Sequence, residues 1–208
     1  MLSADEALQR LREGNHRFRS ESSSRHDDLG ARRAELARGQ DPFAIVLGCA
    51  DSRVPAEIIF DQGLGDLFVI RVAGNIVAPS LVGSAEFAAS RFGSRLVLVV
   101  GHTQCGAVLE TVKELQEPGR IISPNLQAIT DRVRPAVEPL MNEHDDTDEL
   151  VRHAVRANVV RSVQQLEHAS SILENLIRND GLRIVGAEYA LETGEVEFLT
   201  PGELVDPR

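Results

Sequence analysis

The sequence contains one lysine, no tryptophan and only two cysteines. Lys113, the single lysine, stands in a polar stretch with helical periodicity, which makes it a poor candidate for Schiff-base chemistry. No apolar run approaches the roughly 18 residues that a membrane-spanning helix needs. The opening sequence MLSADEALQR is charged where a secretory signal would need an apolar core, and we therefore expect a cytoplasmic protein.

The balance of charges also excludes a class of partner. The net charge is −10, and the 22 basic residues are scattered among 32 acidic ones. Nucleic-acid-binding proteins instead gather Lys and Arg on one face. We therefore expect neither a nucleic acid nor a membrane as partner. The composition, with 42% apolar and 26% charged residues, is ordinary for a globular protein, and the length predicts a single domain over residues 1–208.

Short apolar runs in the first half of the chain predict buried strands. They cover residues 43–47, 67–70 and 96–100, and segments with helical character lie between and after them at 55–60, 82–92 and 105–116. Strands that are apolar throughout are typical of parallel sheets covered on both faces. The predicted fold is therefore α/β, with a mostly parallel central β-sheet flanked by helices.

The remaining segments are expected to extend this core. Residues 1–40 are predicted to form an N-terminal helical extension, with helices over 3–18 and 31–39, before an α/β core over 41–208. We expect an excursion with a short helix over 117–148 and one long or slightly broken helix over 149–181. Residues 182–199 alternate around a Thr193-Gly194 turn, which predicts a hairpin at the edge of the sheet.

Chemically unusual residues follow two of the predicted strands. Cys49, Asp51 and Arg53 come after the first strand, whereas His102 and Cys105 come after the third. The carboxyl ends of parallel strands meet at one edge of a sheet, where functional side chains gather. Thiolates and imidazole are preferred zinc ligands, and a catalytic zinc keeps three protein ligands and one open position. Cys49, His102 and Cys105 would supply that set.

Two simpler interpretations of the cysteines stay open at this point. A single cysteine at the end of a buried strand is most often a small core residue. Two cysteines can also form a disulfide or a metal-free dithiol switch. The coincidence of both thiols, a histidine and an acid at predicted strand ends favours the metal site over either alternative.

Asp51 and Arg53 are separated by one residue, so in an extended or turning segment their side chains can pair. An isolated pair of this kind is usually a surface ion pair worth about 0 to 1 kcal/mol. Next to a zinc ligand, an ionised Asp51 held by Arg53 could instead orient the attacking oxygen, and we predict that role for the two residues.

Three motifs together resemble the β-class carbonic anhydrases, zinc enzymes that interconvert carbon dioxide and bicarbonate. They are CADSRVP at 49–55, RVAGN at 71–75 and GHTQCGA at 101–107. The likeness runs from about residue 5 to the C-terminal hairpin. It implies one zinc ion per chain on Cys49, His102 and Cys105, with Asp51 and Arg53 as the catalytic pair. Zinc-bound hydroxide, oriented by this pair, would then attack carbon dioxide, which is carbonate dehydratase activity.

The resemblance also implies a substrate pocket and an assembly. Substrate contacts are expected from Gln40, Phe68, Ala73 and Gly106. In the family the glutamine and the phenylalanine usually reach the site from the neighbouring subunit, which implies a homodimer or a dimer of dimers.

Two departures from the family bear on its subclasses. The subclass with an allosteric bicarbonate pocket resembles this chain at Arg71, but its tryptophan falls at Val46, and a tyrosine of the plant-like pocket falls at Phe87. We expect the open-site, plant-like subclass; only in a closed site would Asp51 also bind the metal. Hydrolysis of carbonyl sulfide or carbon disulfide at the same zinc, and a non-catalytic bicarbonate-sensing zinc module, are alternative functions.

Overall fold

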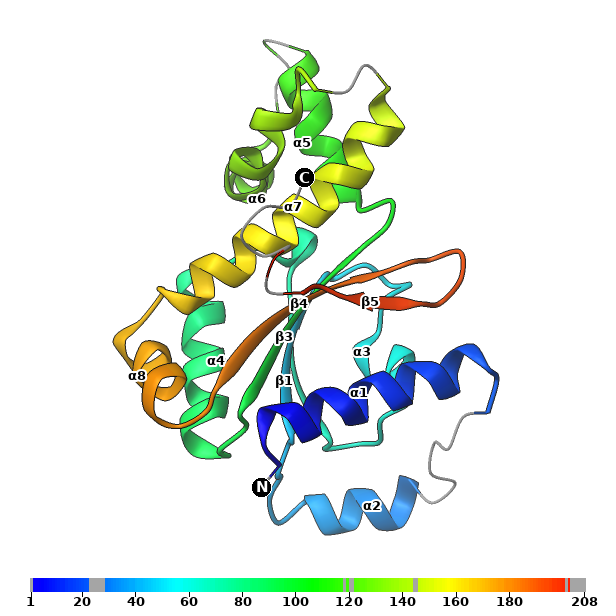
Figure 1. Cartoon of the computed structure of the whole chain (residues 1–208), viewed down its shortest axis with the longest axis vertical. Helices are drawn as coiled ribbons and strands as arrows, with labels where there is room; N and C mark the ends of the chain where they lie inside the picture. The colour runs from blue at the N-terminus through cyan, green and yellow to red at the C-terminus, as the bar shows by residue number, and fades with distance from the viewer. Residues whose placement is uncertain are drawn as a thin grey trace.

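The computed structural model describes residues 2–22, 29–117, 119, 122–143, 146–200 and 202. Within these residues the centre of the molecule is one five-stranded sheet (Figure 1). Its strands are β1 (Ala44–Gly48), β2 (Leu67–Arg71), β3 (Leu96–His102), β4 (Arg183–Tyr189) and β5 (Val196–Phe198). The spatial order is β2-β1-β3-β4-β5, in which the first four strands are parallel and β5 is antiparallel to β4. The predicted α/β fold with a mostly parallel sheet is confirmed.

Helices cover both faces of the sheet. One face packs against α1 (Ala4–Arg19) and α3 (Ala56–Ile59). The other face packs against α4 (Pro79–Arg91), α7 (Thr147–Glu167) and α8 (Ser171–Asn179). Successive residues of a strand enter opposite layers: Val46 belongs to the first apolar cluster and Ile45 to the second. Because both faces are buried, the strands need apolar side chains at every position, and this explains their continuous apolar runs.

A third apolar cluster lies beyond the carboxyl ends of the strands, at the top of Figure 1. It is formed by α5 (Gly106–Gln116), α6 (Pro124–Val137) and the first half of α7, with the short 3₁₀ turns η1 (Ala73–Asn75) and η2 (Glu138–Leu140) beside them. The remaining helix, α2 (Leu29–Leu36), has no buried residue. Among the described residues, no helix combines the length and the apolarity that crossing a bilayer requires.

Three segments differ in detail from the sequence-based expectation. The excursion over 117–148 contains α6, which has 14 residues and is longer than the short helix predicted. The expected long or slightly broken helix over 149–181 is fully divided at residues 168–170, and the Ser170 side chain accepts a hydrogen bond from the Leu173 amide at the start of α8. The C-terminal hairpin is present, but β4 is an inner strand beside β3, and only β5 forms the edge.

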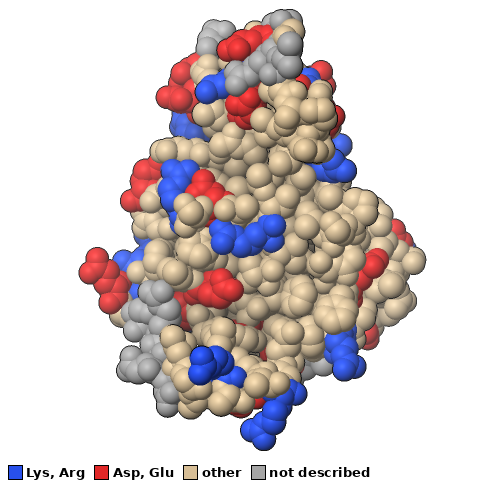
Figure 2. All heavy atoms as spheres, turned by 180° about the vertical axis from the view of Figure 1, so that it is seen from behind, with Lys and Arg blue, Asp and Glu red and all other residues tan. Residues whose placement is uncertain are grey.

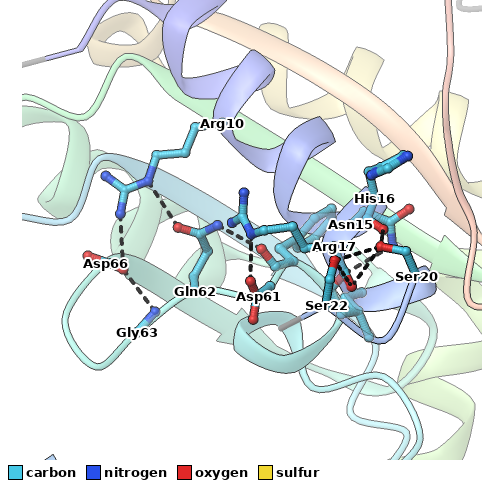
Figure 3. Close-up of polar contacts among 12 residues, drawn as sticks. Arg10, Asn15, His16, Arg17, Ser20, Ser22, Asp61, Gln62, Gly63 and Asp66 are labelled. Carbon is cyan, nitrogen blue, oxygen red and sulfur yellow. Dashed lines mark hydrogen bonds and ion pairs between the residues drawn. The ribbon is translucent and has the colours of Figure 1, made fainter. Parts of the chain in front are cut away.

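Helix α1 is tied to the core by apolar and polar contacts. It begins with a capping box between Ser3 and Glu6, and Leu11 is fully buried against the sheet. On its polar side Arg17 Nε donates to the buried carboxylate of Asp61 at 2.7 Å, and Arg10 reaches Gln62 at 3.0 Å (Figure 3). These contacts fix α1 against the segment that follows α3.

Candidate metal centre

Two sulfurs and one imidazole meet where β1 and β3 end. Cys49 directly follows β1, His102 is the last residue of β3, and Cys105 is the N-cap residue of α5. Strands β1 and β3 are parallel neighbours, so their carboxyl ends lie side by side. One donor atom from each of the three residues lies within 4.8 Å of the other two, and all three side chains are buried. Both cysteines are free thiols.

The orientation of the His102 ring leaves one nitrogen available to a metal. Nδ1 lies 2.8 Å from the carbonyl oxygen of Thr103, to which it donates, so in the neutral ring Nε2 carries the lone pair. Nε2 is buried and has no hydrogen-bond partner among the described residues. Leaving a buried polar atom unpaired costs about 1 to 3 kcal/mol. A metal ion at Nε2 would remove that cost, and the Thr103 carbonyl would hold the ring in the metal-binding tautomer.

The pKa values of the two cysteines are shifted in opposite directions. The neighbouring Cys105 thiol lowers the pKa of Cys49 to about 4, and the Gly74 amide, which donates to Cys49 Sγ at 3.3 Å, acts in the same direction. The pKa of Cys105 is raised, first by the contact with Cys49 and then by burial. Burial lowers the pKa of His102, but the nearby Cys49 thiolate and the Asp51 charge outweigh burial, and the net shift is upward. The lowered pKa of Cys49 favours the thiolate form that a metal ion binds.

Asp51 and Arg53 form the pair that the sequence predicts. Arg53 donates to the Asp51 carboxylate from its backbone nitrogen at 3.0 Å, from Nε at 2.9 Å and from Nη2 at 2.8 Å. These contacts hold the pKa of Asp51 well below its usual range, so the carboxylate is ionised. Asp51 Oδ2 lies 3.9 Å from Nε2 of His102, which places the pair at the edge of the metal centre.

Arg71 braces the loop that carries Cys49 and Asp51. Its Nε donates to the carbonyl oxygen of Cys49 at 3.1 Å, and its Nη2 donates to that of Asp51 at 2.6 Å. Arg71 is the last residue of β2, so the second strand fixes the loop that follows the first. From the sequence, Arg71 was part of the RVAGN motif and of the comparison of subclasses, and its role in holding this loop was not predicted.

Two buried polar residues of α7 hold the η1 turn next to Cys49. Asn158 Nδ2 donates to the Gly74 carbonyl oxygen at 2.8 Å, and Ser162 Oγ donates to that of Asn75 at 3.1 Å. This support was not predicted from the sequence. The available signal was the presence of two polar residues four apart, and hence on one face, among the valines of an otherwise apolar helical stripe.

The four predicted pocket residues fall into two groups. Ala73 begins η1 immediately before Gly74, and Gly106 begins α5 immediately after Cys105, where an added Cβ would meet nothing within 4 Å. Gln40 is exposed and lies before the start of β1, whereas Cys49 follows the carboxyl end of the same strand. The two residues therefore lie at opposite ends of β1. Phe68 lies inside β2 and contacts the rings of Phe87 and Phe92. A single chain thus brings Ala73 and Gly106 to the metal centre, but not Gln40 or Phe68.

Comparisons with known proteins agree with this geometry. The sequence model of a family described as carbonic anhydrase matches residues 44–196. Carbonic anhydrase 2 of Mycobacterium tuberculosis is 38% identical over 188 residues, which cover 90% of this chain and 89% of that protein.

Solved structures show the same fold. The β-carbonic anhydrase CafA of Aspergillus fumigatus superposes with a TM-score of 0.74 at 26% identity, over 98% of this chain and 95% of that chain. One of two tetrameric β-carbonic anhydrases of Sordaria macrospora superposes with a TM-score of 0.72 at 25% identity, over 80% and 85% of the two chains. The chain belongs to the β class of the carbonic anhydrase family of enzymes.

Proposed function

We propose that this chain is a zinc enzyme that interconverts carbon dioxide and water with bicarbonate and a proton. The observation that carries the proposal is the meeting of Cys49, His102 and Cys105 within 4.8 Å, beside an ionised carboxylate. Two thiolates and one imidazole match the donors of a catalytic zinc, and they leave one coordination position open.

The residues present fit a zinc ion. Nε2 of His102 is buried and has no hydrogen-bond partner in the part of the chain that the structure describes, and its ring is held by the Thr103 carbonyl. The N-terminal end of α5 favours negative charge on Cys105, whose sulfur lies at that end. When zinc is bound to the three ligands, it supplies a nucleophile at neutral pH by lowering the pKa of a coordinated water to about 7.

Asp51 is proposed to orient the attacking oxygen. Each of its two carboxylate oxygens accepts a hydrogen bond from the Arg53 guanidinium, which fixes the plane of the carboxylate. A carboxylate oxygen has two lone pairs, so Oδ2 can accept a further hydrogen bond from the nucleophile. That bond would aim one lone pair of the nucleophile at the carbon atom of carbon dioxide. Because Arg53 engages Asp51 in this way, we also propose the open-site arrangement, in which Asp51 is not a ligand.

The substrate pocket is proposed to form between subunits. Ala73 and Gly106 lie next to the ligands in the same chain, whereas Gln40 and Phe68 lie away from them. We assign the latter two to the pocket of a second copy, which makes a homodimer the smallest active unit. Figure 2 shows a broad face whose middle carries few charged side chains, as expected of a surface covered by another subunit.

The test is stopped-flow hydration of carbon dioxide by protein whose zinc content has been quantified. We expect about one zinc per chain and rapid hydration. Zinc-loaded protein without hydration activity would overturn the proposal and favour a sensing module. If hydrogen sulfide is released from carbonyl sulfide faster than carbon dioxide is hydrated, then carbonyl sulfide is the preferred substrate. Metal-free protein with a Cys49–Cys105 disulfide would indicate a dithiol switch.

A further inference from the structure

The two ligands of the second motif are separated by a strained turn. Thr103 and Gln104 lie between His102 and Cys105, and the backbone of Gln104 adopts a φ of 57°, in the left-handed region. A non-glycine residue in that region costs roughly 1 to 2 kcal/mol, so the surrounding structure must hold the turn in place. The relative position of the imidazole and the second thiolate depends on this turn.

One carboxylate from a distant segment holds both residues of the turn. Glu192 lies in the turn between β4 and β5, 88 and 89 positions along the chain from its partners. Its Oε2 accepts a hydrogen bond from Thr103 Oγ1 at 3.1 Å, and its Oε1 accepts one from Gln104 Nε2 at 2.7 Å. The same Thr103 hydroxyl oxygen accepts a hydrogen bond from the Leu191 amide at 3.0 Å. Residues 191 and 192 of the hairpin therefore make three hydrogen bonds to the side chains of the turn.

Glu192 acts on a residue that in turn orients a ligand. The carbonyl oxygen of Thr103 accepts the hydrogen bond from His102 Nδ1, and the Thr103 amide donates to the carbonyl of Tyr189 at 3.0 Å. The pKa of Glu192 is lowered, first by its own backbone amide and then by the Thr103 hydroxyl, and the charge of Arg53 adds to this effect. Glu192 is therefore ionised at neutral pH and accepts charge-assisted hydrogen bonds.

The hairpin is itself fixed to the rest of the site. Asn15, a buried residue of α1, donates from Nδ2 to the carbonyl oxygen of Gly194 at 2.8 Å and accepts from the Val196 amide at 3.0 Å. The same Nδ2 donates to the Ile59 carbonyl oxygen at 3.0 Å, at the end of α3 (Figure 3 labels Asn15). Helix α3 follows the loop of Asp51 and Arg53, so Asn15 ties the hairpin and that loop into one frame.

We propose that Glu192 is a positioning residue of the metal centre, which holds the Thr103–Gln104 turn so that His102 and Cys105 stay in metal-binding geometry. The inference rests on the proposed zinc site, and Glu192 itself touches neither metal nor substrate. Partners that orient metal ligands typically change metal affinity 10- to 100-fold when they are removed.

The test compares Glu192→Ala and Glu192→Gln with Glu195→Ala in the full chain. Glu195 is a matched control because it lies on the same hairpin and is exposed, but it pairs with Arg19 at 2.8 Å. Zinc affinity is measured by competition with a chromophoric chelator. The visible spectrum of the cobalt-substituted protein reports ligand geometry independently of activity.

We expect Glu192→Ala to weaken zinc binding about 10-fold or more and to alter the cobalt spectrum. Glu192→Gln keeps one acceptor oxygen and should recover most of the affinity, whereas Glu195→Ala should stay within about twofold of the parent. Equal affinities and unchanged spectra for the parent and Glu192→Ala would overturn the inference, as would an equal loss in Glu195→Ala.

If Glu192→Ala folds poorly, Gln104→Ala alone keeps the inference testable, because it should weaken zinc binding in the same way and parent-like affinity would contradict the inference. Where both variants fold, a double-mutant cycle tests the link directly. Gln104→Ala removes the other end of the 2.7 Å hydrogen bond, so its effect and that of Glu192→Ala should overlap. The double variant should then bind zinc little worse than Glu192→Ala, and fully additive losses would contradict the proposed link. If the parent protein binds no zinc, the proposed function fails; if the parent binds zinc and Glu192→Ala matches it, only the role of Glu192 fails.

Discussion

The carboxylate of Asp51 accepts three hydrogen bonds from Arg53, at 3.0, 2.9 and 2.8 Å, although the two residues are separated by a single serine. A turn makes this possible: the Val54 amide donates to the Asp51 carbonyl oxygen at 3.1 Å and folds the chain back. The short spacing, the turn and the bidentate pair together hold the Asp51 carboxylate in one orientation at the edge of the metal centre.

Asp51→Asn should separate orientation from metal binding. The amide has nearly the same shape, but it lacks the charge that Arg53 holds and offers one acceptor oxygen instead of two. Removing one such oriented interaction typically costs 10²- to 10³-fold in kcat, so we expect a loss of about 100-fold or more in hydration, with about one zinc per chain retained.

Asp66→Asn is the matched control for that variant, because Asp66 is also ion-paired, with Arg10 at 3.1 Å, but lies away from the metal centre. It should hydrate carbon dioxide at the parent rate. If zinc is lost together with activity in Asp51→Asn, then Asp51 is a ligand and the site is closed. Stopped-flow kinetics and metal analysis of the same samples decide between the two results.

Arg71→Ala should weaken zinc binding without removing a ligand. The variant frees the carbonyl oxygens of Cys49 and Asp51, which Arg71 holds at 3.1 and 2.6 Å. We expect about 10-fold weaker zinc affinity in a chelator competition, as is typical for residues that support metal ligands. Arg33→Ala, which removes an exposed arginine from α2, should leave the affinity unchanged. Parent-like affinity in Arg71→Ala would show that the loop holds its shape unaided.

The sequence predicted the sheet, and it singled out Cys49, His102 and Cys105 as candidate metal ligands, because both predictions start from local patterns. Continuous apolar runs indicate strands buried on both faces, and the two cysteines stand directly after or close to such runs. The prediction that Cys49 and His102 meet also needed β1 and β3 to be neighbours, and the strand order confirms it. The sequence did not supply that adjacency: the general rule says that functional groups gather at carboxyl ends, but not which strands are neighbours.

The supporting residues could not be found in this way, since their roles depend on contacts between distant segments. In the sequence Glu192 is an ordinary acidic residue beside a hairpin turn, and its hydrogen-bond partners lie 88 and 89 positions away. Asn15 lies in an amphipathic helix and gives no sign that it bonds to residues 44, 179 and 181 positions away. Such hydrogen bonds leave no periodicity in the sequence, and only the folded chain reveals them.

Asn158→Ala should destabilise the fold through a lost hydrogen bond in the core. Asn158 is 2% exposed, and the variant leaves the Gly74 carbonyl oxygen without its 2.8 Å donor. An unpaired buried group costs about 1 to 3 kcal/mol, and we expect a decrease of that size in the free energy of unfolding, measured by urea denaturation. Arg152→Ala, on the exposed side of the same helix, is the control. A change in Asn158→Ala as small as that of the control would contradict this assignment.

The partly buried carboxyl group of Glu188 should make stability fall as the pH rises. Burial raises its pKa above 4.5 against the opposing charge of Arg156, and the neighbouring Glu197 raises it further. A raised carboxyl pKa means that the folded state binds more protons than the unfolded state above about pH 4.5, and proton binding by Glu188 therefore stabilises the fold. The stabilisation is complete below that pH and is lost as the pH rises through the pKa of the folded state.

Glu188→Gln stays neutral and should remove that part of the pH dependence. In zinc-loaded proteins, the free energy of unfolding of Glu188→Gln relative to the parent should therefore increase between about pH 4 and pH 7. Urea denaturation at several pH values measures it. A difference that stays constant or decreases with pH would mean that the charge of Arg156, and not burial, governs Glu188.

Gly101 shows why the metal centre requires close packing between β3 and α7. A Cβ at this position would lie 2.5 Å from Cγ2 of Val159, so any larger residue must displace α7 or the strand that carries His102. Overpacking of this kind costs typically 1 to 3 kcal/mol, and Gly101→Ala should lower the free energy of unfolding by about that amount.

Val159→Ala removes the obstructing methyl groups and should therefore restore part of the lost stability in the double variant, although it is destabilising alone. Val163→Ala, one turn further along α7 and equally buried, should give no such rescue when combined with Gly101→Ala. The free energies of unfolding of the single and double variants are measured by urea denaturation. If the changes were additive in both double variants, the packing argument would be contradicted.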